Sequence, residues 1–253
     1  MQTFTLPRPD GHALLTRAWR PEGAPRAVVQ IVHGLAEHSA RYARLAQALT
    51  GAGYAVYAHD HRGHGPNCKP EDLGFFAERD GWRKLLDDVD AVAARIAADL
   101  PGVPRVYLGH SMGSFLGQRY LAERGESLTA AVLSGTAGPP PAILGIGRLI
   151  VAFERWRLGP RGRSALVQAL LFGEQNKPFR PARTPYDWLS RDAAEVDKYV
   201  ADPFCGFPLT NQLAADLAAA LSDLASPALA ARIPKSLPIY IFSGSRDPVG
   251  AKL

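Results

Sequence analysis

One stretch of this sequence indicates the fold: Gly109-His110-Ser111-Met112-Gly113. It lies between a short apolar run, Val106 to Leu108, and a segment of helical character that starts at Met112. This is the G-x-S-x-G pattern, placed on a sharp turn between a strand and a helix. A serine on such a turn takes a strained backbone conformation and exposes its hydroxyl. The two glycines are required because a Cβ at either position would collide with the neighbouring strand and helix. We therefore expect Ser111 to be a nucleophile.

Apolar runs and helical patterns alternate on both sides of this stretch. Strands are expected within 1–20, broken at residues 9–11, and at 27–32, 54–58, 106–108, 130–133 and 238–242. Helices are expected after Ser39, over 82–100, and from Met112 to about Arg124. This alternation favours an α/β fold with a mostly parallel, doubly wound sheet. Between 138 and 232 helical segments and prolines replace the alternation, which indicates a helical cap inserted between a first core part, 1–137, and a second, 233–253.

Length and composition limit the class of protein. The 253 residues, 47% apolar and 21% charged, suit one large globular domain. No apolar run reaches the roughly 18 residues that cross a bilayer, and the first residues carry no apolar signal region, so a cytoplasmic protein is expected. Cys68 and Cys205 match no metal or redox spacing and are expected to be free thiols.

The net charge of +5 is unevenly distributed. Between Arg148 and Arg183 eight basic residues stand against two acidic ones. No nucleic-acid-binding motif accompanies this segment, so a solvated surface or contact with anionic lipid is expected rather than nucleic acid. An apolar stripe that includes Ile146, Ile150 and Phe153 overlaps the start of this segment. The stripe either packs on the core or lines a lipid entry, and the neighbouring arginines favour an interfacial surface.

A serine nucleophile needs donors for the oxyanion and an acid that orients its base. One donor is expected from the backbone N–H of Met112, and the other from Leu35 in the loop His33-Gly34-Leu35-Ala36-Glu37-His38. The alternative for this loop is a simple tight turn. Asp247, which follows the strand at 238–242, is expected to be the acid, although an aspartate before proline is also an ordinary turn residue.

Three stretches together resemble the monoacylglycerol lipase and lysophospholipase branch of the α/β-hydrolases. They are the loop at 33–42, Asp60-His61-Arg62-Gly63-His64-Gly65, and Gly109 to Gly113. Residues 187–192 and 202–206 resemble the cap of the bacterial members. The resemblance covers essentially the whole chain and implies a serine hydrolase of carboxylic esters, with Ser111 as nucleophile, Asp247 as acid, Leu35 and Met112 as oxyanion donors, and a cap that forms an apolar acyl tunnel.

The chain departs from this family at the base of the triad. In this fold the histidine follows the acid, yet all seven histidines precede Ser111. The chain is therefore expected to be either a fragment that lacks the last strand and helix or a protein without the base. His110 is expected to point to the other side of the sheet, and the other histidines to belong to the oxyanion loop or to a structural turn. The histidines near Cys68 match no common zinc spacing, so no metal is expected.

The function expected is hydrolysis of a lipid ester, a monoacylglycerol or lysophospholipid, through an acyl-enzyme on Ser111 without a cofactor. The alternatives are a catalytically impaired acyl- or lipid-binding protein and another serine-hydrolase chemistry, namely a thioesterase, peptidase or acyltransferase. Ile146, Ile150 and Phe153 are the expected substrate-binding residues. The sequence leaves the oligomeric state open. An unpaired edge at 238–242 is expected to make the chain prone to aggregation.

Overall fold

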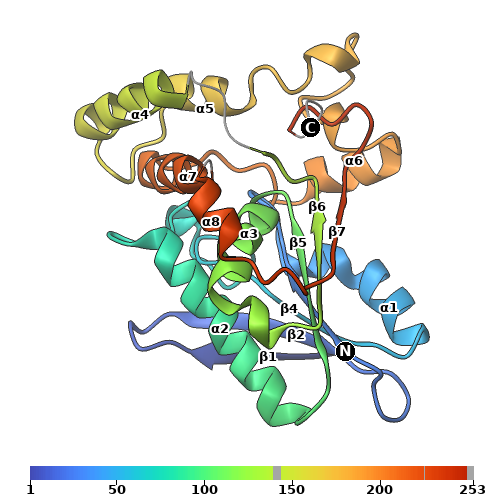
Figure 1. The fold of residues 1–253 in the computed structure, drawn as a ribbon. Helices are drawn as coiled ribbons and strands as arrows, with labels where there is room; N and C mark the ends of the chain where they lie inside the picture. Colours follow the sequence, from blue (N-terminus) through green and yellow to red (C-terminus); the bar gives the residue numbers. More distant parts are fainter. Residues whose placement is uncertain (139–143, 225, 250–253) are drawn as a thin grey trace.

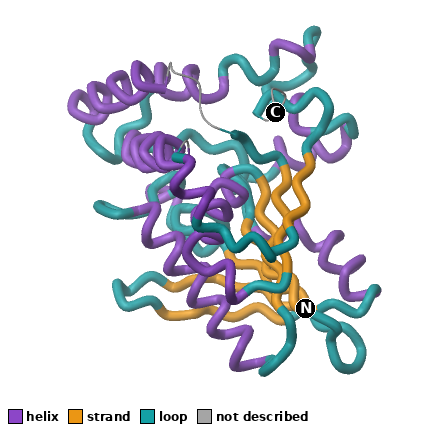
Figure 2. The backbone as a smooth tube through the Cα atoms, viewed as in Figure 1, coloured by secondary structure: helices purple, strands orange, loops and turns teal. Residues whose placement is uncertain are grey.

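The structure, a computed structural model, describes residues 1–138, 144–224 and 226–249. Within these residues seven strands form one sheet in the spatial order β1-β2-β4-β3-β5-β6-β7 (Figures 1 and 2). The strands are β1 (Gln2–Pro7), β2 (Ala13–Trp19), β3 (Val28–Val32), β4 (Ala55–His59), β5 (Arg105–His110), β6 (Ala130–Ser134) and β7 (Ile239–Phe242). Each lies within or beside a range expected from the sequence.

The sheet is mostly parallel, as the alternation of strands and helices predicts. β1 pairs with β2 and β2 with β4 in antiparallel fashion, and the pairs from β4 through β3, β5 and β6 to β7 are parallel. Every residue of β3 and β4 is buried, which is what a nearly continuous apolar run indicates for a strand covered on both faces. The parallel strands therefore end together at one edge, where loops can form a site.

Helices cover both faces of this sheet. The α-helices are α1 (Ala43–Gly51), α2 (Gly81–Asp99), α3 (Met112–Arg124), α4 (Leu144–Leu158), α5 (Ala165–Phe172), α6 (Ala193–Ala201), α7 (Asn211–Leu224) and α8 (Pro227–Ala231). Short 3-10 helices are η1 (Ser39–Tyr42), η2 (Pro70–Asp72), η3 (Gly125–Ser127), η4 (Lys177–Phe179) and η5 (Asp187–Leu189). α1 lies on one face, and α2, α3 and α8 lie on the other (Figure 1).

The helical segment between β6 and β7 lies beyond the carboxyl ends of the parallel strands. α4, α5 and α6 are at the top of Figure 1, above these strand ends. α7 and α8 return to the sheet layer and contact α3. The structure assigns no strand to residues 144–224 or 226–238, in keeping with an all-helical insertion. Among the described residues no helix has both the length and the apolar character to cross a membrane.

A buried ion-pair network fixes the turn after β4. Arg62 contacts Asp88 of α2 at 2.7 Å and Asp10 at 2.6 Å, and Asp88 is fully buried. A second pair joins Arg17 of β2 to Asp60 at 2.9 Å. Breaking a buried pair leaves one charge without its partner, which typically costs about 3–5 kcal/mol. The turn at 60–65 therefore has a structural role, as the sequence predicts.

β7 forms an edge of the sheet, and its four apolar side chains are all exposed, Tyr240 by 66%. An open apolar edge can pair with another chain, so we expect the polypeptide of residues 1–253 to self-associate as its concentration rises. A charge at Tyr240 should suppress this association, because a lysine on an edge strand opposes pairing. Light scattering measures the average molecular mass of the Tyr240→Lys protein and of the unsubstituted chain over a range of concentrations.

Leu45→Lys on α1 is the control for this comparison, because Leu45 is also an exposed apolar residue but lies away from the edge. It should leave the association unchanged. A monomer at every concentration, or equal suppression by both substitutions, would show that the edge of β7 is not the contact.

Candidate active site

Ser111 occupies the sharp turn between β5 and α3. Its backbone angles, φ 49° and ψ −118°, lie outside the regions that L-residues ordinarily occupy, as the sequence predicts for a strained turn. Its N–H donates to the carbonyl of Ser134 at 2.8 Å, which ties the turn to the end of β6. Its own carbonyl accepts from the hydroxyl of Ser114 at 2.6 Å. The strain is thus maintained by contacts on both sides.

The two flanking glycines are required by their surroundings. A Cβ on Gly113 would lie 2.0 Å from the carbonyl oxygen of Val32, and one on Gly109 would lie 2.4 Å from the carbonyl oxygen of Gly113. Both contacts are to backbone, which cannot rotate away as a side chain can. The sequence-based explanation of these glycines is confirmed.

The loop after β3 approaches the turn closely. The position of a Cβ on Gly34 would be 3.2 Å from the Cβ of Ser111. Within this loop Gly34 N–H donates to Glu37 Oε1 at 2.7 Å, and Ala36 N–H donates to His64 Nε2 at 3.1 Å. The N–H of Leu35, between them, has no hydrogen-bond partner within residues 1–138, 144–224 and 226–249.

The N–H of Met112 is the second of the two expected donors. It also has no hydrogen-bond partner among the described residues, because Met112 is the first residue of α3 and has no preceding turn to bond to. Leu35, Met112 and Ser111 line the same cavity. Two backbone donors without a partner among the described residues therefore belong to residues that line the same cavity as Ser111.

The loop after β3 is anchored by α6 and by the segment that follows it. The carbonyl of Ala36, a residue with a positive φ of 54°, accepts from the hydroxyl of Tyr199 at 2.8 Å and from the N–H of Gly206 at 3.0 Å. His38 Nε2 lies 2.8 Å from Asp202 Oδ2. The helical insertion thus restrains the loop that carries Leu35.

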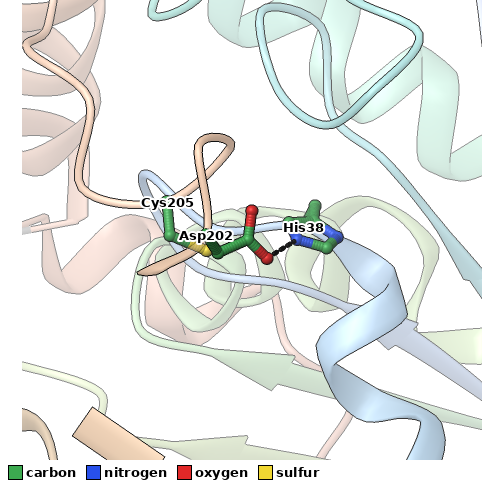
Figure 3. A group of neighbouring side chains, drawn as sticks. All are labelled: His38, Asp202 and Cys205. Atoms are coloured by element: carbon green, nitrogen blue, oxygen red, sulfur yellow. Dashed lines mark hydrogen bonds and ion pairs between the residues drawn. The ribbon is translucent and has the colours of Figure 1, made fainter. Parts of the chain in front are cut away.

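Figure 3 shows His38, Asp202 and Cys205, whose potential ligand atoms lie within 4.8 Å of one another. Asp202 already receives hydrogen bonds from His38 and from the N–H of Phe204 at 2.9 Å. Burial raises the pKa of the Cys205 thiol to about 12, so the thiol stays protonated at neutral pH. We therefore interpret the group as a structural link and assign no metal to it.

Asp247 lies in the loop after β7 and lines the cavity that contains Ser111. Its Oδ1 accepts from the N–H of Val249 at 2.9 Å. Its Oδ2 is 3.4 Å from the position that a Cβ on Gly135 would take, directly after β6. The structure thus places Asp247 at the same edge of the sheet as Ser111.

His110 differs from expectation. Its Cε1 lies 3.4 Å from the same Cβ position on Gly135, its Cδ2 lies 3.4 Å from the Cβ position on Gly34, and it lines the cavity. Its Nδ1 is 3.2 Å from the hydroxyl of Ser134. The prediction that His110 points to the other side of the sheet is wrong, because the turn at Ser111 breaks the alternation of side chains along β5.

No histidine forms a hydrogen bond with the Ser111 hydroxyl within the described residues, which include all seven histidines. His33, His59, His61 and His64 form a buried cluster behind the oxyanion loop, with the rings of His33 and His61 4.1 Å apart. His33 Nε2 accepts the N–H of His61 at 2.9 Å. These residues support the loop and do not act as a base for Ser111.

Acid should destabilise the fold through this histidine cluster. Burial lowers the pKa of all four imidazoles, to about 4 for His59 and His64. Because the unfolded pKa is near 6.5, the unfolded state binds more protons at mildly acidic pH, so stability is complete above about pH 6.5 and falls toward pH 4. When the pH is lowered from about 7.5 to about 5, we expect the free energy of unfolding to fall by roughly 2 kcal/mol per histidine. Urea unfolding at the two pH values measures this change.

His59→Leu is the matched variant for this prediction. Neither ring nitrogen of His59 has a hydrogen-bond partner among the described residues, so leucine removes a titrating group without breaking a hydrogen bond. The dependence of stability on pH should become shallower in this variant. A urea midpoint that is equal at both pH values in the unsubstituted chain would contradict the role of the cluster.

The cavity that Ser111 lines, here called the Ser111 cavity, has a volume of about 1660 Å³. Its wall is largely apolar and comes from α3, α5 and α7, with Phe115, Leu171, Phe172, Leu217 and Leu221. Glu37 and Arg41, which pair at 2.8 Å, add a polar region near the loop after β3. The cavity can therefore hold an apolar chain beside a hydrophilic group.

The expected substrate-binding residues Ile146, Ile150 and Phe153 do not line this cavity. They belong to α4, where Ile146 and Phe153 are 60% and 54% exposed. Helical spacing indicates that such residues share one face of the helix. It does not indicate whether that face lines the cavity, packs on the core or is exposed to solvent. The wall comes instead from α5 and α7, and the regular leucines of α7 were the signal available in the sequence.

Comparisons with known proteins agree with this geometry. A family model described as serine aminopeptidase, S33, matches residues 23–252. Mouse monoglyceride lipase is 32% identical over 247 residues, which cover 94% of this chain and 71% of the relative. Monoacylglycerol lipase of Mycolicibacterium smegmatis is 33% identical over 243 residues, 94% of this chain and 76% of the relative. A solved carboxyl esterase from Bacillus coagulans, 27% identical, superposes with a TM-score of 0.90 over 98% of this chain and 81% of its own.

Proposed function

The chain belongs to the family described as serine aminopeptidase, S33, within the α/β-hydrolases, and we propose from this premise that it is a serine hydrolase of lipid carboxylic esters. The observation that carries the proposal is the Ser111 cavity. A strained serine, a carboxylate, and two backbone N–H groups that have no partner in the part of the chain that the structure describes all belong to residues lining one largely apolar space. An acyl ester fits such a site, since its chain is apolar and its carbonyl becomes an oxyanion when attacked.

The proposed roles follow from the geometry. The Ser111 hydroxyl attacks the acyl carbonyl, and the N–H groups of Leu35 and Met112 hold the oxyanion that forms. Collapse of this intermediate expels the alcohol and leaves an acyl-enzyme, which water then cleaves. Asp247 is suited to orient an imidazole that takes the serine proton and returns it to the leaving alcohol. Residues 1–253 present no imidazole in that position, so we assign the base to none of their histidines.

Monoacylglycerol or lysophospholipid is the substrate class we propose. The apolar wall from α5 and α7 would hold a single acyl chain, and Glu37 and Arg41 offer hydrogen bonds to hydroxyl groups. The relatives named monoglyceride lipase and monoacylglycerol lipase support this choice. We retain residues 138–232 as the cap in this proposal, since α5, the segment at 185–191 and α7 supply much of the cavity wall.

We also propose peripheral contact with a membrane surface through α4. Leu149 and Trp156 are 73% and 80% exposed, and Arg148 and Arg155 are exposed on the same helix. Exposed apolar side chains beside basic ones suit insertion at an anionic lipid interface. In this role Ile146 and Phe153 would face lipid at the outside of the cap. A cytoplasmic location stays a prediction from the sequence.

A substrate panel tests the proposed function. The protein is incubated with monodecanoylglycerol, a decanoyl thioester and an amino-acid amide, and the released acid or amine is measured with and without added imidazole. We expect release of decanoate from the glycerol ester, increased by imidazole. Release of amine but not decanoate would favour the aminopeptidase that the family description names. Binding of monodecanoylglycerol without any release, with imidazole present, would favour an acyl-binding protein.

A further inference from the structure

A second cavity lies beside the Ser111 cavity, and four of its ten lining residues are arginines. Its volume is about 350 Å³, and Arg180, Arg183, Arg191 and Arg246 line it. We call it the arginine cavity. The two cavities share part of their wall, including Arg191 and Arg246, so they are adjacent spaces of one larger depression.

The positive charge in the arginine cavity is only partly neutralised by the described residues. Arg183 pairs with Asp197 at 2.6 Å and with Asp187 at 3.9 Å, but Arg180, Arg191 and Arg246 form no ion pair within residues 1–138, 144–224 and 226–249. Most arginines of the first 130 residues, in contrast, contact a carboxylate. The unpaired arginines gather here from the segment at 180–191 and from the loop after β7.

One carboxylate, Asp187, also lines the arginine cavity, but its oxygens are already engaged. Its Oδ1 accepts from the hydroxyl of Thr184 at 2.6 Å, and its Oδ2 accepts from the N–H of Thr184 at 3.1 Å. The hydrogen bond from the hydroxyl of Thr184 lowers the pKa of Asp187, so this carboxylate stays ionised. Its hydrogen bonds stabilise the local turn that begins at Thr184. Asp187 thus leaves the three unpaired guanidinium groups without a partner.

Two of these arginines are held in place by neutral groups. Arg246 donates to the carbonyl of Pro178, and its guanidinium lies 4.9 Å from the centre of the Phe179 ring. Arg191 donates to the hydroxyl of Ser245 at 3.4 Å. A guanidinium has five N–H donors, so each keeps several donors free while its position is restrained. Restrained guanidinium groups with free donors suit bidentate binding of a phosphate.

The position of Arg246 relates this site to catalysis. It directly precedes Asp247, so their Cα atoms are about 3.8 Å apart. In a lysophospholipid the phosphate and the acyl ester are separated only by the glycerol carbons. Resting on the proposed function, we propose that the arginine cavity binds the phosphate of a lysophospholipid whose carboxylic ester reaches Ser111.

Equilibrium binding tests this proposal without relying on turnover. Calorimetry with the Ser111→Ala protein, which cannot form an acyl-enzyme, compares decanoyl lysophosphatidate, monodecanoylglycerol and inorganic phosphate. We expect the lysophosphatidate to bind about 10- to 100-fold more tightly than the glycerol ester, as charge-assisted hydrogen bonds to two arginines allow. The double variant Arg180→Gln/Arg191→Gln should remove this difference. Arg180→Gln alone should reduce the difference and leave the affinity for monodecanoylglycerol unchanged, because Arg180 lines the arginine cavity but not the Ser111 cavity.

Arg232→Gln is the matched control, since Arg232 is an exposed arginine that follows α8 and lines neither cavity. It should keep the full preference for lysophosphatidate. Equal affinity for the two lipids, or a preference that survives the double variant, would overturn the proposal while leaving the proposed function intact. Inorganic phosphate that binds as tightly as lysophosphatidate would overturn the lipid assignment in favour of a free anion. Failure of both lipids to bind would instead count against the proposed function.

Discussion

Replacing Ser111 with alanine is expected to abolish covalent labelling by a fluorophosphonate, together with all fatty acid release above the solution background. The reason is that the reacting oxygen itself is removed, while the strained turn and both backbone donors stay in place. In the unsubstituted chain labelling should be slow and should accelerate with added imidazole, because no histidine of the described residues forms a hydrogen bond with the Ser111 hydroxyl. Intact-protein mass spectrometry measures the adduct, and peptide mapping locates it.

Ser114→Ala is the matched control for this experiment. Ser114 is a buried serine three residues away, and its hydroxyl donates to the carbonyl of Ser111. Its replacement should cost about 1 kcal/mol of stability but leave the labelling site unchanged. An adduct of equal yield on the Ser111→Ala protein would show that Ser111 is not the nucleophile.

The second large effect is expected on stability. Gly113→Ala should lower the free energy of unfolding by about 3 kcal/mol, since overpacking a close contact forces the backbone to move. The new Cβ would lie 2.0 Å from the carbonyl oxygen of Val32 and 2.6 Å from that of His33, so α3 must move away from the end of β3. Urea unfolding followed by circular dichroism measures the loss.

Gly145→Ala provides the comparison for Gly113→Ala. Gly145 lies in α4, and a Cβ there would meet no atom of the described residues within 4 Å. Alanine should therefore be neutral or slightly stabilising, by up to about 1 kcal/mol, because it has the higher helix propensity. Equal urea midpoints for the two variants would contradict the steric explanation of Gly113.

The fold was predictable from the sequence because its signals are local. The apolar run at 27–32 becomes the fully buried β3, and the helical spacing over 82–100 becomes α2 (Gly81–Asp99). The exact ends differ by a residue or two, since helices and strands fray at their ends. The role of the arginine at position 62 was also indicated, although its partners Asp10 and Asp88 became known only from the packing.

The residues that line the Ser111 cavity were less predictable from the sequence. Ile146 and Phe153 have the apolar spacing of a tunnel wall, yet they lie on the exposed side of α4. His110 follows the alternation of β5 in the sequence but lines the cavity, because the chain turns at the next residue. Which face of a helix meets the cavity depends on how the helix packs against others, and its own periodicity does not specify this.

The sequence by itself determined the turn at Gly109 to Gly113, because the required glycines and the strained serine lie within five consecutive residues. Tertiary structure decided which distant groups meet there. His38 reaches Asp202 across 164 positions, and Arg246 joins Arg180 and Arg191 beside the Ser111 cavity. Such convergence depends on the crossing of helices and the path of the cap over the sheet. No local pattern encodes these distances, because they result from the packing of the whole chain.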